Sequence, residues 1–196
     1  MSLSFRAGRT RFEISYLFFA VAMIFLIWDK SRMSVAIIVS SVAHEAAHIA
    51  AMALCGQMPS KISFGLTGIK AVKPNRLSDT VGKDMFIFLA GPGVNLFAAA
   101  VIALSGGAGR LGFFFAANLF LGVFNLLPVG TMDGGNFLGV LLGKHLSDRV
   151  ANLAGRLISF FILAILFLVG FILAFSPFYN PTLLFIAVYL LIGELA

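Results

Sequence analysis

Long apolar runs, separated by short polar segments, recur along this chain of 196 residues. A helix needs about 20 apolar residues to cross a hydrocarbon layer about 30 Å thick. Charged residues make up only 11% of the chain, whereas a typical soluble domain has about 25%. The sequence therefore predicts an all-α polytopic membrane protein that forms a single membrane-embedded domain, residues 1–196, with no separate soluble domain.

Six apolar runs are the expected membrane spans. Their approximate ranges are 14–28, 33–54, 85–104, 111–127, 153–175 and 181–195. One short helix is expected over 136–142, in the Gly-rich stretch between the fourth and fifth spans. The first run has no small-residue cleavage site followed by a soluble chain, so we expect an uncleaved helix and no signal peptide.

The distribution of positive residues predicts the orientation in the membrane. With a cytoplasmic N-terminus, every Lys and Arg except Lys30, Arg32 and Arg110 falls in a cytoplasmic segment. Such a bias indicates a multi-pass protein with both termini in the cytoplasm. The net charge of +6 is then explained by loops that meet the anionic lipid bilayer, and no nucleic acid partner is expected.

The segment 61–72 has a different pattern from the spans. Ile62, Phe64 and Leu66 alternate with Ser63, Gly65 and Thr67, which predicts a β-strand, and Gly65 with Gly68 permits a tight bend. We expect a short membrane-associated β-ribbon here, with an ordinary amphipathic loop as the alternative. A strand formed by Ile62, Phe64 and Leu66 could pair with an extended substrate by strand addition.

The second predicted span contains His44-Glu45-Ala46-Ala47-His48. Residues four apart lie on one face of a helix, so both imidazoles can bind one Zn²⁺ ion. Glu45 lies beside the pair and suits a general base that acts on water. The alternative is that both histidines only make packing hydrogen bonds, but this leaves a costly charge unexplained at Glu45.

A catalytic zinc site needs a third protein ligand. Asp133, in the stretch Asn125-Leu126-Leu127-Pro128-Val129-Gly130-Thr131-Met132-Asp133-Gly134, is the strongest candidate. Pro128 would end the preceding helix, and an irregular segment could carry Asp133 back toward the metal. An ordinary cytoplasmic turn at the Asp-Gly pair explains the same residues equally well.

These motifs resemble those of the site-2 family of intramembrane zinc metalloproteases. The likeness is carried by HEAAH in an early span, by a later N-x-x-P…D-G, and by Gly91-Pro92-Gly93-Val94-Asn95, which is similar to a G-P-x-x-N motif. It implies that His44, His48 and Asp133 bind one zinc ion and that Glu45 activates water. The segment NLLPVGTMDGG is most similar to the sequences of the sporulation branch, stage IV sporulation protein FB, although Thr131 stands where many relatives have a second proline.

The resemblance implies an intramembrane endopeptidase that cuts a membrane-tethered protein, releasing a transcription factor such as a sporulation pro-sigma factor. Regulatory membrane proteins are expected partners. Two alternatives are a divalent metal-ion transporter, which would carry more ionisable residues along a pathway, and a non-catalytic membrane scaffold.

Three asparagines lie in the apolar spans. Asn95 and Asn125 are candidates for orienting the site or the substrate, with interhelical hydrogen bonding as the alternative for Asn95. Asn118 lies seven residues before Asn125, and interhelical hydrogen bonding is the favoured expectation for it.

Overall fold

The structure is a computed structural model of the chain. It describes residues 2–7, 10–16, 20, 23–24, 26–27, 29, 32–58, 61–65, 68–72, 81–109, 111–176 and 180–195. These residues form two compact units, residues 1–123 and 124–196, and each unit is described by itself.

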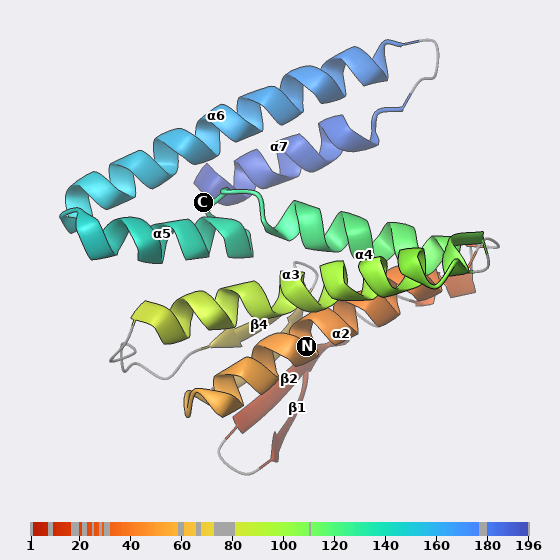
Figure 1. The fold of residues 1–196 in the computed structure, drawn as a ribbon, viewed down its shortest axis with the longest axis horizontal. Coiled ribbons are helices and arrows are strands. Elements are labelled where there is room, and N and C mark those ends of the chain that lie inside the picture. The colour runs from red at the N-terminus through yellow and green to blue at the C-terminus, as the bar shows by residue number, and fades with distance from the viewer. Residues whose placement is uncertain are drawn as a thin grey trace. The chain divides into compact units, whose positions relative to one another are not determined.

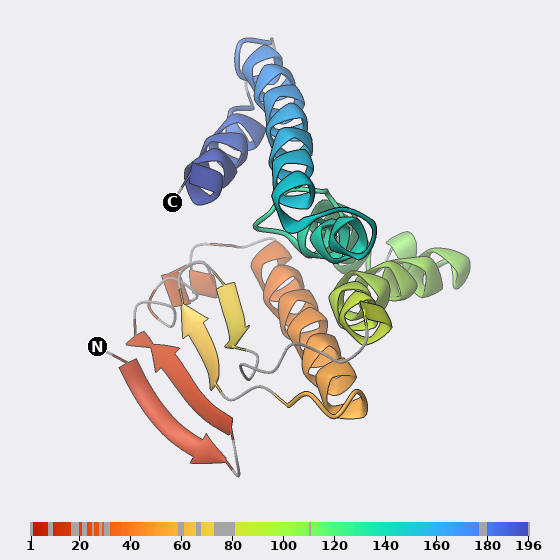
Figure 2. The same ribbon diagram turned by 90° about the vertical axis from the view of Figure 1, so that its left-hand side faces the viewer.

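The first unit contains a four-stranded sheet of order β1-β2-β3-β4 (Figure 2). Its strands are β1 Ser2–Ala7, β2 Thr10–Ser15, β3 Lys61–Gly65 and β4 Gly68–Val72. β1 pairs antiparallel with β2, β2 pairs parallel with β3, and β3 pairs antiparallel with β4. Because β2 and β3 are parallel, the chain between them must cross over, and α2 lies in that connection.

The sheet confirms the predicted ribbon at 61–72 and extends it. The register brings Gly65 opposite Gly68, as the expected tight bend requires, while Leu66 lies outside the described residues. The expectation that β3 pairs with a substrate strand is wrong for this sheet. Both sides of β3 are already bonded, to β2 and to β4, so the sheet edges among the described strands are β1 and β4.

The predicted first span is wrong at its N-terminal end. Ile14 and Ser15 belong to β2, which holds Ile14 opposite Leu3 of β1 and Phe64 of β3. The reason is the short alternation of apolar Phe12 and Ile14 with polar neighbours, which suits a strand. Much of 16–28 lies outside the described residues, so a helix there stays a prediction.

Among the residues that the structure describes, the first unit also holds α2 Met33–Leu54, α3 Val81–Leu104, a 3-10 turn Gly107–Gly109, and most of α4 Gly112–Asn125. α2 and α3 pack directly against each other (Figure 1). α2 begins after a left-handed residue, Arg32, and the carboxylate of Asp29 accepts a hydrogen bond from the Ser34 N–H. This contact satisfies one of the backbone donors that a helix start leaves open.

The second unit contains an irregular segment, 126–132, followed by three helices. These are α5 Asp133–His145, α6 Asp148–Ala174 and α7 Thr182–Leu195. α6 packs along α7 and against α5 (Figure 1). Val129, Leu163 and Leu190, from the irregular segment, α6 and α7, form its buried apolar cluster.

Within the described part of the chain, five helices therefore lie where spans were expected. Three of them, α2, α3 and α6, are long and apolar enough to cross a bilayer, which identifies an integral membrane protein. α4 and α7 have only 14 residues each, and the count of six spans stays a prediction. The short helix expected at 136–142 is longer at both ends and begins at Asp133.

Candidate metal centre

Most buried residues of α2 form a stripe spaced by four. It includes Ser40, His44 and His48, and it is continued at its ends by Ala36 and Met52. Residues four apart lie above one another on a helix, so this spacing alone places both imidazoles on one side. His44 and His48 retain only 5% and 8% of their exposure.

α3 presents a matching stripe at the same spacing, formed by Ile87, Gly91, Asn95 and Ala99. Rows of residues four apart are the ridges by which helices interlock. Small residues in these rows, such as Gly91, let two helix backbones approach closely. The α2–α3 contact therefore places a buried asparagine and an open main-chain surface beside the two imidazole rings.

Each imidazole is held by its Nδ1 atom. His44 Nδ1 lies 2.6 Å from Asn95 Oδ1, and His48 Nδ1 lies 2.7 Å from the carbonyl oxygen of Ile87. An amide oxygen and a carbonyl oxygen only accept hydrogen bonds. Each Nδ1 atom must therefore carry a proton and donate it.

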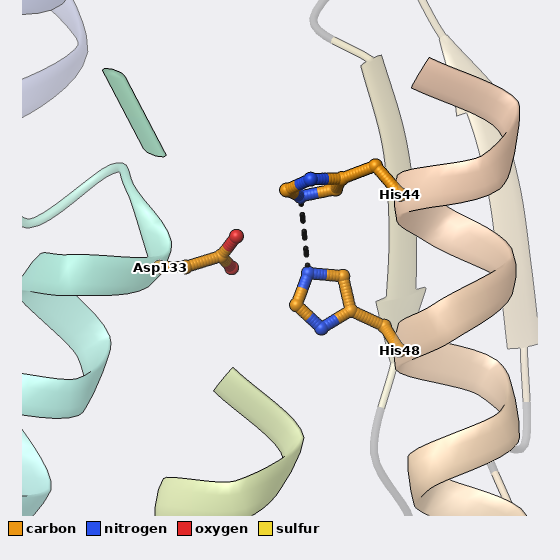
Figure 3. A group of neighbouring side chains, drawn as sticks. All are labelled: His44, His48 and Asp133. Carbon is orange, nitrogen blue, oxygen red and sulfur yellow. Dashed lines mark hydrogen bonds between the residues drawn. The ribbon is translucent and has the colours of Figure 1, made fainter. Parts of the chain in front are cut away.

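The opposite nitrogens of the two rings face each other. His44 Nε2 and His48 Nε2 lie 3.1 Å apart, as the dashed line in Figure 3 marks. A neutral imidazole carries one proton, and both rings use it at Nδ1, so the facing atoms both present lone pairs. Two lone pairs at this distance repel each other, and a cation that lies against both, such as a proton or a metal ion, relieves that repulsion.

The separation fits a metal ion. Zinc–nitrogen distances of about 2.0–2.1 Å place two ligands of a tetrahedral ion about 3.3 Å apart, close to the observed 3.1 Å. Hydrogen bonding of the second ring nitrogen is also the usual support for metal-binding histidines.

Gly91 leaves the room that such an ion needs. A Cβ atom built on Gly91 would lie 2.4 Å from His48 Nε2 and 2.6 Å from His44 Nε2. No side chain can be placed there while both nitrogens keep their positions. The glycine of the G-P-x-x-N motif is thus explained by the space beside the imidazole lone pairs.

Glu45 follows His44 on α2 and is half-buried. It lies next to the stripe rather than in it, since consecutive helix residues are about 100° apart around the axis. The Glu45 carboxyl is thus an ionisable group on the same helix turn as the two imidazoles.

Asp133 lies in the second unit, as the first residue of α5, and is half-buried (Figure 3). An irregular segment, 126–132, leads directly into Asp133, as predicted, and the helix begins at this residue, so the Asp-Gly pair does not form an ordinary loop turn. A carboxylate is favoured in the first turn by the backbone N–H groups there. Asn125, the last residue of α4, precedes the irregular segment 126–132.

The irregular segment before Asp133 is tightly folded onto α5. Cβ atoms built on Gly134 and Gly135 would lie 2.1 Å from Leu126 O and 2.0 Å from Val129 O. The Gly130 N–H donates to Ser159 Oγ at 3.0 Å, and that hydroxyl donates to Pro128 O at 3.3 Å. These contacts hold the position of Asp133 within its unit.

Within the first unit, the structure brings together three of the predicted site residues, His44, His48 and Asn95. It also adds residues that were not assigned to the site: Gly91, the Ile87 carbonyl, Ser40 and Asn118. Asn118 makes the interhelical hydrogen bonds expected of it. Asn118 could be recognised from the sequence because it is a polar residue in an apolar helix. The Ile87 contact could not, because it is made by a main-chain carbonyl that every residue has.

Residues 105–169, about a third of the chain, match the model of peptidase family M50. The fold of the chain is similar to that of "Site-2 Protease from Methanocaldococcus jannaschii", with a TM-score of 0.68 and 23% identity over 99% of this chain and 94% of that one. No curated protein sequence matches this chain.

Proposed function

We propose that this protein is an intramembrane zinc-dependent endopeptidase. The observation that carries the proposal is the pair of buried imidazoles whose Nε2 atoms lie 3.1 Å apart, on a helix apolar enough to cross the bilayer. The M50 match and the site-2 protease fold support peptide hydrolysis as the reaction.

His44, His48 and Asp133 are the proposed zinc ligands. Each offers one ligand atom of a type that zinc accepts, and two imidazoles with one carboxylate are a donor set of catalytic zinc sites. Since the histidines and the aspartate belong to different units, the proposal requires both units to act as one membrane-embedded protease domain.

Glu45 is the proposed general base and acid. Zinc bound at this site would supply the Lewis acid that polarises the scissile carbonyl and acidifies water. The Glu45 carboxylate then takes a proton from the attacking water and delivers it to the leaving amine. Asn95 holds the His44 ring, and Asn125 is proposed to orient the substrate near the end of α4.

The proposed substrate is a membrane-tethered protein whose scissile bond lies in or near its transmembrane segment. Release of a transcription factor, such as a sporulation pro-sigma factor, is the finer proposal. It is supported by the likeness of NLLPVGTMDGG to the stage IV sporulation protein FB branch, which also suggests regulatory membrane proteins as partners.

Six spans with both termini in the cytoplasm are the proposed topology. The supporting evidence is the distribution of Lys and Arg, since only Lys30, Arg32 and Arg110 would lie outside. The short helices α4 and α7 would then cross where the bilayer is locally thin.

The test uses the full chain in lipid nanodiscs with tagged, membrane-tethered candidate substrates. Wild type should retain one zinc ion per chain by elemental analysis and cleave a substrate. Glu45→Gln should retain zinc but lose about 10²–10⁴-fold in cleavage rate. Asp133→Asn should lower both zinc content and cleavage.

Matched controls separate these effects from charge loss in general. Glu13→Gln in β2 and Asp148→Asn at the exposed start of α6 should leave zinc and cleavage unchanged. Wild-type protein that never retains zinc, or Glu45→Gln cleaving at the wild-type rate, would overturn the proposal. Altered metal uptake by Glu45→Gln vesicles would favour the transporter instead.

A further inference from the structure

A buried chain of hydrogen bonds lies behind His44. Asn95 Nδ2 donates to Asn118 Oδ1 at 2.8 Å and to the Ser40 carbonyl at 3.2 Å. Asn118 Nδ2 donates to Ser40 Oγ at 2.8 Å and to the Phe114 carbonyl at 2.9 Å. Asn95, Ser40 and Asn118 are 0%, 2% and 6% exposed, so water does not compete for these bonds.

Two main-chain carbonyls determine which group donates and which accepts in each of these hydrogen bonds. The carbonyl oxygens of Phe114 and Ser40 can only accept, so each must face an amide NH₂ group. Asn118 therefore turns its NH₂ toward Phe114 and its Oδ1 toward Asn95. Asn95 in turn directs its NH₂ at Ser40 and Asn118, which leaves its Oδ1 for His44.

The last hydrogen bond of this series, between Asn95 and His44, determines which nitrogen of the His44 ring carries the proton. Because Asn95 presents an oxygen to His44 Nδ1, that nitrogen must carry the ring proton, and Nε2 keeps its lone pair. If the Asn95 amide were reversed, its NH₂ would face Nδ1, and the neutral ring would carry its proton on Nε2. A proton there would block the atom that the proposed zinc ion needs.

We propose that Asn118 and Ser40 are positioning residues that hold His44 in the Nδ1–H tautomer and so keep Nε2 open for a metal ion. They act through Asn95, since Asn118 is linked to the ring by two successive hydrogen bonds. The part of this inference that concerns metal binding rests on the proposed function; the tautomer itself does not.

The first test compares wild type with Asn118→Leu in metal-free, full-length protein carrying ¹⁵N-labelled histidine. Nitrogen NMR distinguishes the two tautomers directly. Wild type should show His44 protonated at Nδ1, whereas Asn118→Leu should show a mixture of tautomers, because Asn95 then loses one of the two acceptors that orient it.

The second test is a titration with Co²⁺ as the metal probe. Asn118→Leu should weaken Co²⁺ binding about 10–100-fold, as loss of outer hydrogen-bond partners usually does. Asn152→Leu, the same change at an exposed position on α6, should bind Co²⁺ like wild type. Far-UV circular dichroism and thermal unfolding would show whether both variants keep the fold.

Ser40→Ala keeps the test decisive if Asn118→Leu does not fold, since it removes one hydroxyl and little volume. It should weaken Co²⁺ binding a few-fold and raise the share of the Nε2–H tautomer. Wild-type tautomer and affinity in the folded variants would overturn the inference. A wild type that binds no Co²⁺ would overturn the proposed function instead, and the tautomer comparison would still decide this inference.

Discussion

His44 Nε2 lies 3.1 Å from His48 Nε2, although the acceptors behind the two rings leave neither nitrogen a proton. The two acceptors come from α3, one from a side chain and one from the main chain. The close approach of the two Nε2 atoms is therefore produced by helix packing, and a cation that lay against both would relieve the repulsion between their lone pairs.

Replacement of Gly91 by alanine should abolish metal binding. The new methyl group would lie within 2.6 Å of both Nε2 atoms, so the rings must turn away from each other. We expect at least about a 100-fold loss of Co²⁺ affinity, in line with disrupted ligand orientation. Gly93→Ala is the matched control, since its Cβ meets nothing within 4 Å; wild-type affinity in Gly91→Ala would contradict the prediction.

Replacement of Gly134 by alanine should destabilise the second unit. Its Cβ would lie 2.1 Å from the Leu126 carbonyl oxygen, and backbone cannot move aside as a flexible side chain can. Overpacking of this kind costs about 1–3 kcal/mol of unfolding free energy, measurable by thermal unfolding in detergent.

The control for this prediction lies in the same helix. Gly139→Ala places its methyl group in open space, and removal of a mid-helix glycine stabilises by roughly 0.5–1 kcal/mol. Equal stabilities for the two variants would show that the irregular segment 126–132 does not pack on α5 as described.

Ser159→Ala should loosen the segment that precedes Asp133. The hydroxyl accepts from the Gly130 N–H and donates to the Pro128 carbonyl, and one such bond contributes about 1 kcal/mol. Faster amide exchange at Gly130 and slower cleavage are the expected results. Ser176→Ala, just beyond the C-terminal end of α6, removes a local hydrogen bond to Leu173 O and should change neither.

The contact between β2 and β3 should weaken at low pH. Lys61, which donates a hydrogen bond to Glu13, together with the charges of Lys61 and Arg11, lowers the pKa of that carboxyl despite some desolvation. Because the pKa is lowered in the folded state, the ion pair stabilises the sheet at pH values above the ordinary pKa of glutamate. This contribution is lost as pH falls through the folded-state pKa.

Amide exchange in β2 and β3 at pH 7 and pH 3 would measure this effect. In wild type, the amide protection factor at pH 7 should exceed that at pH 3. This ratio should be smaller in Glu13→Gln, which lacks the titrating carboxyl. The change should be modest, because the pair is on the surface. An unchanged ratio would mean that the ion pair contributes nothing to the sheet.

The spacing of residues along the chain was enough to predict part of this structure. The range 33–54 for the second helix agrees with α2 at both ends, because a long apolar run can satisfy its backbone only as a helix in a membrane. Spacing by four also placed His44 and His48 on one face without any knowledge of packing.

The sheet was only half predicted. Alternation at 61–65 indicated β3, but β1 and β2 were missed because the apolar run that follows Ile14 masked the shorter alternation before it. A single sequence also cannot show that β3 is paired on both sides, since pairing is decided by strands that are about 50 residues apart.

The sequence by itself determined the apolar helices, the two imidazoles on one face and the carboxylates available to join them, because these follow from local periodicity and residue type. Only the tertiary structure decided which nitrogen of each ring carries the proton. That choice depends on the Ile87 carbonyl and on the orientation of the Asn95 amide, which exist as neighbours of the rings only when α3 packs against α2.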